Sequence, residues 1–271
     1  MMTFFTLVAF ALGLILGSFL NALAYRLPRK ESLMTRSHCP KCDKKIHAWE
    51  NIPVLSWLAL RGKCSGCKAP ISLQYPLIEL GTGLLFAALT SKAYQLTLPN
   101  ELSLNGFLWV ELLLLSFAFI GVLVTLIDLD IRKIPSNIVY SGLAVALLAA
   151  LGYAVTVGNY SNLIAAVISG AAFYAVYFLL WFLKPGSLGY GDVRLSLLAG
   201  FVIGWVAPQA SVIGFFLPWF LALIAVIPGL LRKNVDAKTA IPFGPWLVLG
   251  SILAILFGDI FANFYLQLGS V

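Results

Sequence analysis

Residues 104–135 read LNGFLWVELLLLSFAFIGVLVTLIDLDIRKIP, an apolar run that ends in two aspartates, two basic residues and a proline. A transmembrane helix needs roughly 20 consecutive apolar residues, and this run provides them. Carboxylates are costly near the hydrocarbon and usually belong to a functional site. The stretch therefore predicts a membrane-spanning helix with an acidic site at the end that carries Asp128 and Asp130.

The rest of the chain has the same apolar character. It has 271 residues, of which 61% are hydrophobic and 11% charged, and its mean hydropathy is +0.94. A soluble domain carries roughly 25% charged residues, so this composition excludes an ordinary soluble protein. We predict an all-α polytopic membrane protein with about eight transmembrane helices, at about 3–24, 75–95, 104–127, 137–157, 161–183, 192–208, 210–231 and 241–267.

The first and the sixth apolar segments differ from the others. The first apolar segment has no basic residue before it, unlike a cleavable signal peptide, so we expect residues 1–24 to be a retained first helix. The sixth segment, 192–208, is short, and a bent or re-entrant segment also fits it. The predicted organisation is the helix at 1–24, a cytoplasmic loop at 25–74, and a membrane core of about seven helices at 75–271.

The basic residues are distributed asymmetrically. All but one of the 18 lysines and arginines fall in or beside the loops that follow odd-numbered apolar segments, and the exception is Lys92. Positive loops stay in the cytoplasm, so we expect both termini on the outer side. The net charge of +7 is then first a topology signal, and we expect membrane lipid as a partner and no nucleic acid.

All four cysteines lie in the first cytoplasmic loop, as CPKC at 39–42 and CSGC at 64–67. Two C-x-x-C motifs can arrange four thiolates tetrahedrally around Zn²⁺. A disulfide is disfavoured in a reducing cytosol, although a redox role or unligated thiols stay open as alternatives. With four protein sulfurs as ligands no position is left for substrate, so we predict a structural site at Cys39, Cys42, Cys64 and Cys67.

A second acidic group occurs in GSLGYGDVRLSLLAG, residues 186–200. Asp192 and Asp128 both fall at the predicted cytoplasmic face, and Asp128 lies deeper than Asp130, which a helix-end ion pair explains. Two close carboxylates in a low-dielectric site share one proton, and such a pair can act as general base and general acid. We therefore predict Asp128 and Asp192 as catalytic, with Gly189 and Gly191 shaping an irregular active-site loop.

Other intramembrane chemistries lack their residues. Both histidines lie in the cysteine loop, so neither an H-E-x-x-H zinc site nor a serine–histidine pair is available in the membrane. Two alternatives remain: a proton-coupled transporter that uses the buried carboxylates as a relay, and an adaptor built on the cysteine loop. Neither alternative uses both the acids and the cysteines.

Several motifs follow one another along the chain, and their order carries a family resemblance. They are GSFLNALAYRLP at 17–28, the paired C-x-x-C loop, ENIPVLSWLALRGKC at 50–64, YPLIEL at 75–80, IDLDIRKIP at 127–135 and GYGD at 189–192. Over about residues 1–200 the chain resembles bacterial type IV prepilin peptidases, which are G-x-G-D intramembrane aspartyl proteases. Beyond residue 200 only the hydropathy is similar.

The resemblance implies an inner-membrane endopeptidase that removes the basic leader of type IV prepilins and of secretion pseudopilins. It would cut after a glycine and before a hydrophobic residue, and many members also methylate the new N-terminus with S-adenosylmethionine. The family's catalytic aspartates correspond to Asp128 and Asp192, and its cysteines to Cys39, Cys42, Cys64 and Cys67.

The chain departs from the family pattern at two positions, with Ser136 where Asp is common and Arg194 where Lys is common. A basic leader would not be attracted to the basic loop. We therefore expect Glu79 or Glu50 to contact the substrate.

Overall fold

The computed structural model describes residues 1–35, 37–97, 104–184, 186, 188–231 and 242–268. The chain forms two compact units, Met1–Ser91 and Lys92–Val271, and each is described by itself. Arg36 and the predicted cytoplasmic loop with Arg232, Lys233 and Lys238 lie outside the described residues.

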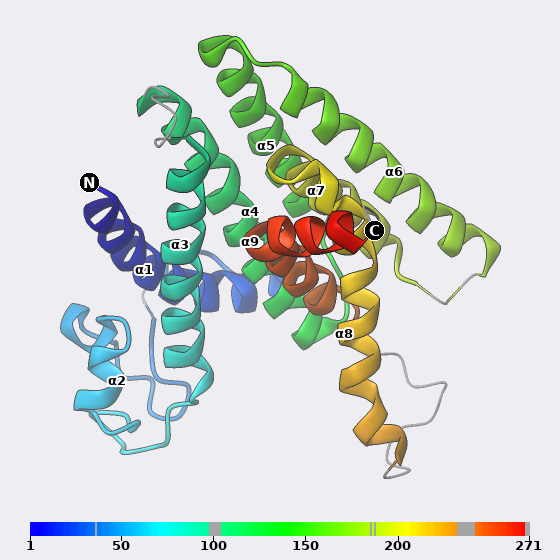
Figure 1. Ribbon diagram of the computed structural model, residues 1–271. Coiled ribbons are helices and arrows are strands. Elements are labelled where there is room, and N and C mark those ends of the chain that lie inside the picture. Colours follow the sequence, from blue (N-terminus) through cyan, green and yellow to red (C-terminus); the bar gives the residue numbers. More distant parts are fainter. Residues whose placement is uncertain (36, 98–103, 185, 187, 232–241, 269–271) are drawn as a thin grey trace. The chain divides into compact units, whose positions relative to one another are not determined.

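Long helices dominate both units (Figure 1). The described residues contain no β-strand, only two isolated bridges, which confirms the all-α prediction. The eight long helices are α1 (Met2–Arg29), α3 (Gln74–Thr97), α4 (Leu104–Ile131), α5 (Ser136–Val157), α6 (Ser161–Leu183), α7 (Tyr190–Val206), α8 (Ser211–Leu231) and α9 (Gly244–Leu268). Each of them coincides with one predicted apolar segment.

Five stretches of the described residues are long and apolar enough to cross a membrane: Met2–Arg29, Leu104–Ile131, Ser136–Val157, Ser161–Leu183 and Pro208–Ile227. They confirm a multi-pass membrane protein. The number of eight spans stays a prediction, because α3, α7 and α9 do not meet the same criterion over their described residues.

In the first unit, α1 packs closely on α3. A methyl group added to Gly17 would lie 2.8 Å from the Cα of Glu79, and one added to Gly13 would lie 2.7 Å from the carbonyl oxygen of Thr82. Small residues spaced as Gly13 and Gly17 are let two helix backbones approach in this way. The helix also runs to Arg29, beyond the predicted end at residue 24, because basic residues are favourable in a last helical turn.

In the second unit, α7 is the central helix. It contacts α4, α5, α6, α8 and α9, and most of its residues are buried. Gly200 and Gly204 allow its close contact with α6, where added methyl groups would meet Phe173 and Ser169. The short sixth segment is thus one regular helix, followed by a 3₁₀ turn at Pro208–Ala210 that leads into α8.

The basic residue that departs from the charge asymmetry has a partner within the second unit. Lys92, in α3, forms an ion pair with Asp259, in α9, and Lys92 is buried. Buried charges are normally paired, because an isolated charge is costly to remove from water. Asp259 therefore connects α9 to α3 through an ion pair.

Candidate functional site

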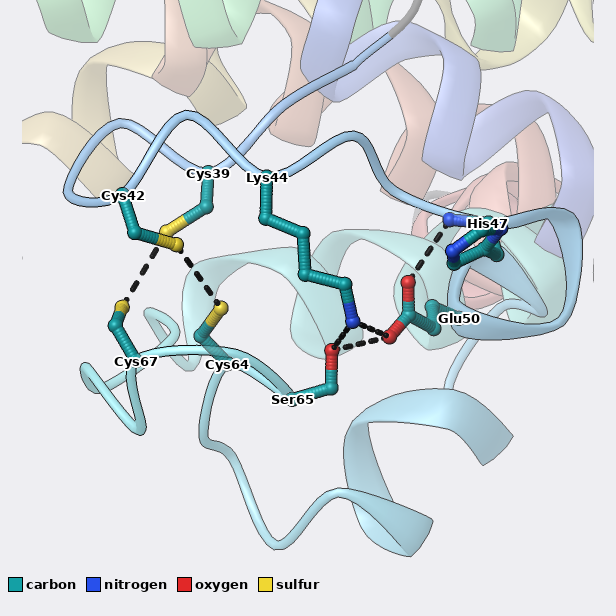
Figure 2. A network of polar contacts seen from close by, with 8 residues as sticks. All are labelled: Cys39, Cys42, Lys44, His47, Glu50, Cys64, Ser65 and Cys67. Carbon is teal, nitrogen blue, oxygen red and sulfur yellow. Dashed lines mark hydrogen bonds and ion pairs between the residues drawn. The ribbon is translucent and has the colours of Figure 1, made fainter.

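The four cysteines of the first unit come together in one cluster (Figure 2). The Cys39 and Cys67 sulfurs are 3.8 Å apart, and the Cys42 and Cys64 sulfurs 4.0 Å apart. All four ligand atoms lie within 4.8 Å of one another. Four sulfurs placed tetrahedrally at the Zn–S distance would be separated by about 3.8 Å. The cluster therefore fits a metal ion of this size, as the C-x-x-C spacing predicted.

The two C-x-x-C motifs have the same local geometry. In the first, the Cys39 amide donates to the Lys44 carbonyl (2.9 Å), and in the second the Cys64 amide donates to the Ala69 carbonyl (2.8 Å). The fifth residue of each turn, Asp43 or Lys68, has a positive φ near 60°. Each turn thus directs two sulfurs to the same side.

The thiols of the cluster lie in different electrostatic surroundings. The backbone N–H groups of Cys67 and Gly66 lower the pKa of Cys64 to about 6. At Cys42 the Lys44 backbone lowers the pKa, but the neighbouring Cys67 thiol and desolvation raise it to about 11. Backbone donors that point at a sulfur stabilise its thiolate form, which is the form that binds a metal.

A polar network connects the two cysteine turns (Figure 2). The Lys44 ammonium donates to Glu50 Oε1 (3.2 Å) and to the Ser65 hydroxyl (2.6 Å), and that hydroxyl donates to Glu50 Oε1. The amide of His47 donates to Glu50 Oε2 (2.9 Å). The His47 amide, the Ser65 hydroxyl and Lys44 lower the pKa of Glu50 to about 2. Both oxygens of Glu50 thus have partners within the loop, which indicates a structural role, and its contact with substrate stays a prediction.

Glu79 also has a local partner. Its Oε2 accepts a hydrogen bond from the Val54 amide (2.7 Å), and its side chain is buried. Val54 has a φ of +62° and precedes the short helix α2 (Leu55–Ala59), so Glu79 ties the start of α2 to α3. Contact between Glu79 and a substrate is likewise a prediction that the structure does not test.

The two predicted catalytic aspartates lie in the second unit and are both buried, with 5% of Asp128 and 7% of Asp192 exposed. Asp128 is in the last turn of α4, and its Oδ2 accepts a hydrogen bond from the Gly244 amide at the start of α9 (3.1 Å). Asp192 is in the first turn of α7, and its Oδ2 accepts one from the Gly189 amide (3.1 Å). Each carboxylate is therefore held through one oxygen.

The two aspartates belong to one site. Their carboxylates interact electrostatically, and Ile134 packs between Gly191, which precedes Asp192, and Gly244, which holds Asp128. A methyl group on Gly191 would lie 2.7 Å from Ile134 Cβ, and one on Gly244 would lie 3.1 Å from its Cδ1. Asp130 is exposed instead, in agreement with the choice of Asp128 over Asp130. The catalytic role of the pair stays a prediction.

The glycines before and within α7 act differently from our expectation. Only Gly186 has a positive φ (+86°), whereas Gly189 is extended and Gly191 is helical. A methyl group on Gly189 would lie 2.8 Å from Asp192 Oδ2, so this glycine leaves room for the carboxylate. Gly189 and Gly191 are thus required for close packing around Asp192, and the irregular backbone lies before them.

The two positions that depart from the family pattern touch each other. The Arg194 guanidinium donates a hydrogen bond to the Ser136 hydroxyl, and it lies over the Tyr190 ring at 4.3 Å. A neutral acceptor with Arg thus occupies the positions where an Asp and a Lys are common. The two departures from the family pattern therefore form one contact.

Some residues of the site escaped sequence reasoning. Gly244 holds Asp128, and Tyr177 of α6 lies beside Asp192. Trp219 of α8 and Phe243, which precedes α9, pack against the Tyr177 ring. The Phe-Gly-Pro sequence at 243–245 is a visible helix-start signal, but nothing in it indicates which carboxylate it meets.

Residues 11–93 match the bacterial peptidase A24 N-terminal domain, and residues 112–267 match the type IV leader peptidase family. The chain belongs to the type IV leader peptidase family. The match extends to residue 267, so the family likeness does not end near residue 200 as the motifs suggested.

Similar proteins carry one common description, "Prepilin leader peptidase/N-methyltransferase". This leader peptidase is 34% identical to the protein of Stutzerimonas stutzeri, over 97% of this chain and 94% of the relative. It is 35% identical to that of Pseudomonas putida (94% and 92%) and 32% identical to that of Pseudomonas aeruginosa PAO1 (97% and 94%). No solved structure matches the chain.

Proposed function

We propose that this leader peptidase removes the basic leader of type IV prepilins and pseudopilins as an aspartic endopeptidase, cutting after a glycine. The observation that carries the proposal is the pair of buried carboxylates from α4 and α7, each held by a backbone amide and close enough to interact electrostatically. The names of the relatives support the substrate class. They lend no support to the alternative of a proton-coupled transporter.

The residues of the pair suit general acid–base catalysis. In both carboxylates Oδ2 is anchored, and in Asp192 Oδ1 is buried without a partner among the described residues. One ionised carboxylate would remove a proton from water as the water oxygen attacks the peptide carbonyl carbon. The other, protonated, would donate a hydrogen bond to the carbonyl oxygen, and a proton then passes to the leaving amine.

We also propose on which side of the membrane the cleavage takes place. Both termini would lie in the periplasm and the aspartates at the cytoplasmic face of the bacterial inner membrane, because the basic residues predict that orientation. The apolar helix of a prepilin would lie in the bilayer beside the enzyme and bring its leader junction to the carboxylates.

Two further activities of the chain belong to the proposal. Residues 25–74 would bind Zn²⁺ through the four cysteines, and residues 75–271 would form the protease core. Because all four ligands are protein sulfurs, the ion would be structural. The relatives' names support methylation of the new N-terminus, for which S-adenosylmethionine would be the donor.

Cleavage by the purified enzyme in detergent tests the proposal. We expect Asp128→Asn and Asp192→Asn each to lower the rate of leader removal by about 10²–10⁴-fold, because each removes one acid–base group. Asp130→Asn is the matched control, since it makes the same change at an exposed neighbour and should retain activity. Mass spectrometry of the product detects leader loss and an added methyl group separately. Full cleavage by both Asn variants would reject the aspartic mechanism.

A further inference from the structure

Buried polar groups without partners are concentrated beside Asp192. Among the residues that the structure describes, the buried side-chain atoms without a hydrogen-bond partner are Tyr177 Oη, Asp192 Oδ1, Arg194 Nε, Trp205 Nε1 and Trp219 Nε1. Such groups are rare in folded proteins, and they are especially costly where no water is available, as in the membrane interior. A local group of them points to a ligand that supplies the missing partner.

Tyr177 lies next to both Asp192 and Trp219. The Tyr177 side chain is fully buried and interacts electrostatically with Asp192. Its ring lies 5.7 Å from the Trp219 ring, and both rings contact Phe243, at 6.2 Å and 4.7 Å. Phe243 precedes Gly244, whose amide holds Asp128. Both aromatic donors therefore contact Phe243, the residue before the amide that holds Asp128.

The type of polar group indicates the type of ligand. An indole N–H is only a donor, and a phenol O–H donates readily. Trp219 Nε1 lies near Tyr177 Oη, but the two do not meet hydrogen-bond geometry. Phenylalanines such as Phe215 pack in the same group of rings as Tyr177. Apolar packing alone therefore does not require the hydroxyl of Tyr177 or the indole of Trp219. The missing partner is therefore an acceptor that both donors can approach.

We propose that Tyr177 Oη–H and Trp219 Nε1–H donate hydrogen bonds to the carbonyl oxygen of the peptide bond that the aspartates cut. As water attacks, this oxygen becomes an oxyanion with three lone pairs, which can accept from both donors as well as from the protonated carboxyl group. Asp192 Oδ1 is also buried without a partner among the described residues. Donors that are already in position stabilise the negative charge that develops on this oxygen as water attacks. The inference rests on the proposed peptidase function and adds two substrate-binding residues to it.

The first test compares variants that lose the donor: Tyr177→Phe removes only the hydroxyl, whereas Trp219→Phe removes the indole N–H together with part of the ring. We expect Tyr177→Phe and Trp219→Phe each to lower kcat/KM by about ten- to a hundredfold, which is the loss of one hydrogen bond to developing charge. The substrate is a peptide with a basic leader, the Gly–Phe junction and the following apolar segment. Tyr153→Phe is the matched control, because Tyr153 contacts Trp205 at the opposite end of α7 and should keep wild-type kcat/KM.

The second test identifies the carbonyl. A peptide with a thioamide at the scissile glycine offers sulfur, a weaker acceptor, in place of the oxygen. The wild-type enzyme and Tyr153→Phe should prefer the oxygen peptide over the thioamide by a larger factor than Tyr177→Phe does. If the preference is the same in all three enzymes, Tyr177 has another role and the inference is overturned.

The outcomes separate this inference from the proposed function. Wild-type cleavage that is lost in Asp128→Asn but unchanged in Tyr177→Phe and Trp219→Phe rejects the inference alone. Cleavage that Asp128→Asn and Asp192→Asn leave intact rejects the aspartic mechanism. Peptide binding to the Asp128→Asn variant, with and without Tyr177→Phe, gives a readout without cleavage, and equal affinities would also reject the inference.

Discussion

At the scale of single residues, the site depends on backbone amides and on small side chains more than on charged partners. Asp128 and Asp192 each accept a hydrogen bond from a glycine amide, at Gly244 and Gly189. Neither of these carboxylates has an ion pair among the described residues. A backbone amide fixes the position of an oxygen and favours the ionised carboxylate, which suits the general-base role that we propose for one of the pair.

Gly244 is the residue whose substitution should reveal this dependence. A methyl group there would lie 2.8 Å from Asp128 Oδ2, too close for the carboxylate to keep its position. We expect Gly244→Ala to lower the cleavage rate by about ten- to a hundredfold, because small displacements of a catalytic group are costly. Gly81→Ala is the control, since nothing lies within 4 Å of its added methyl group. Equal cleavage by the two variants would contradict the role of Gly244.

The contact between Ser136 and Arg194 yields a second prediction at this scale. Ser136→Ala removes the acceptor of the Arg194 hydrogen bond and should lower the free energy of unfolding by about 1 kcal/mol. Ser136→Asp restores the carboxylate that is common in the family, at the first residue of α5, where negative charge is favourable. Thermal unfolding in detergent should rank Ser136→Asp above the wild type and Ser136→Ala below it, and any other order would contradict the linkage of the two positions.

At the scale of elements, the cysteine loop is held by contacts between short turns. It has only a short 3₁₀ turn, Ala48–Asn51, and the helix α2, and most of its side chains are exposed. The Lys44–Glu50–Ser65 network connects its two halves, and Glu79 fixes the start of α2. A loop with so small an apolar core needs such connections, or a metal ion, to adopt one conformation.

The Lys44–Glu50–Ser65 network predicts how fast the loop would release a bound zinc ion. We expect Glu50→Gln to release zinc to a chelator faster than the wild type, because the two cysteine turns lose their charged link. The folded-state pKa of Glu50, about 2, lies below its usual 4.5, so its stabilisation is complete above pH 4.5 and is lost as the pH falls toward 2.

The difference between Glu50→Gln and the wild type should therefore be constant from pH 6 to pH 8. Zinc release can be followed with a colorimetric chelator, with Glu31→Gln, an exposed change, as the control. A difference that disappears within this pH range would contradict the assignment.

At the scale of the whole molecule, the aspartate pair and the cysteine cluster belong to different compact units. The cysteines lie in Met1–Ser91, whereas both aspartates and their glycine donors lie in Lys92–Val271. Each unit contains its own close helix contacts, through Gly17 in the first and Gly200 in the second. The two units can therefore respond differently to loss of the metal.

Removal of the metal should disturb one unit selectively. We expect Cys39→Ser with Cys64→Ser to expose the loop at residues 37–73 to hydrogen exchange, because two ligands are lost and the remaining contacts are few. The amides of α4 and α7 should keep their protection, since those helices are packed by buried apolar side chains. Exchange measured by mass spectrometry distinguishes this result from a general loss of the fold, which would contradict the prediction.

Composition, motif spacing and the distribution of charge predicted much of the fold and part of the candidate site. Hydropathy located all eight long helices, the C-x-x-C spacing predicted the cysteine cluster, and depth in α4 separated Asp128 from Asp130. These features depend on local sequence, because a helix in lipid satisfies its own backbone and a ligand pair needs only a short turn.

Contacts between distant segments could not be predicted from the sequence. These contacts depend on which distant segments meet in the folded chain. They are the Gly244 hydrogen bond to Asp128, the partners of Glu50 and Glu79, the contact of Ser136 with Arg194, and the aromatic donors near Asp192. Nearly every position of an apolar helix looks equally suited to face lipid or protein, so the sequence pattern carries little information about those faces. Packing chooses among them, and it thereby determines which polar atoms find partners and which remain available for a substrate.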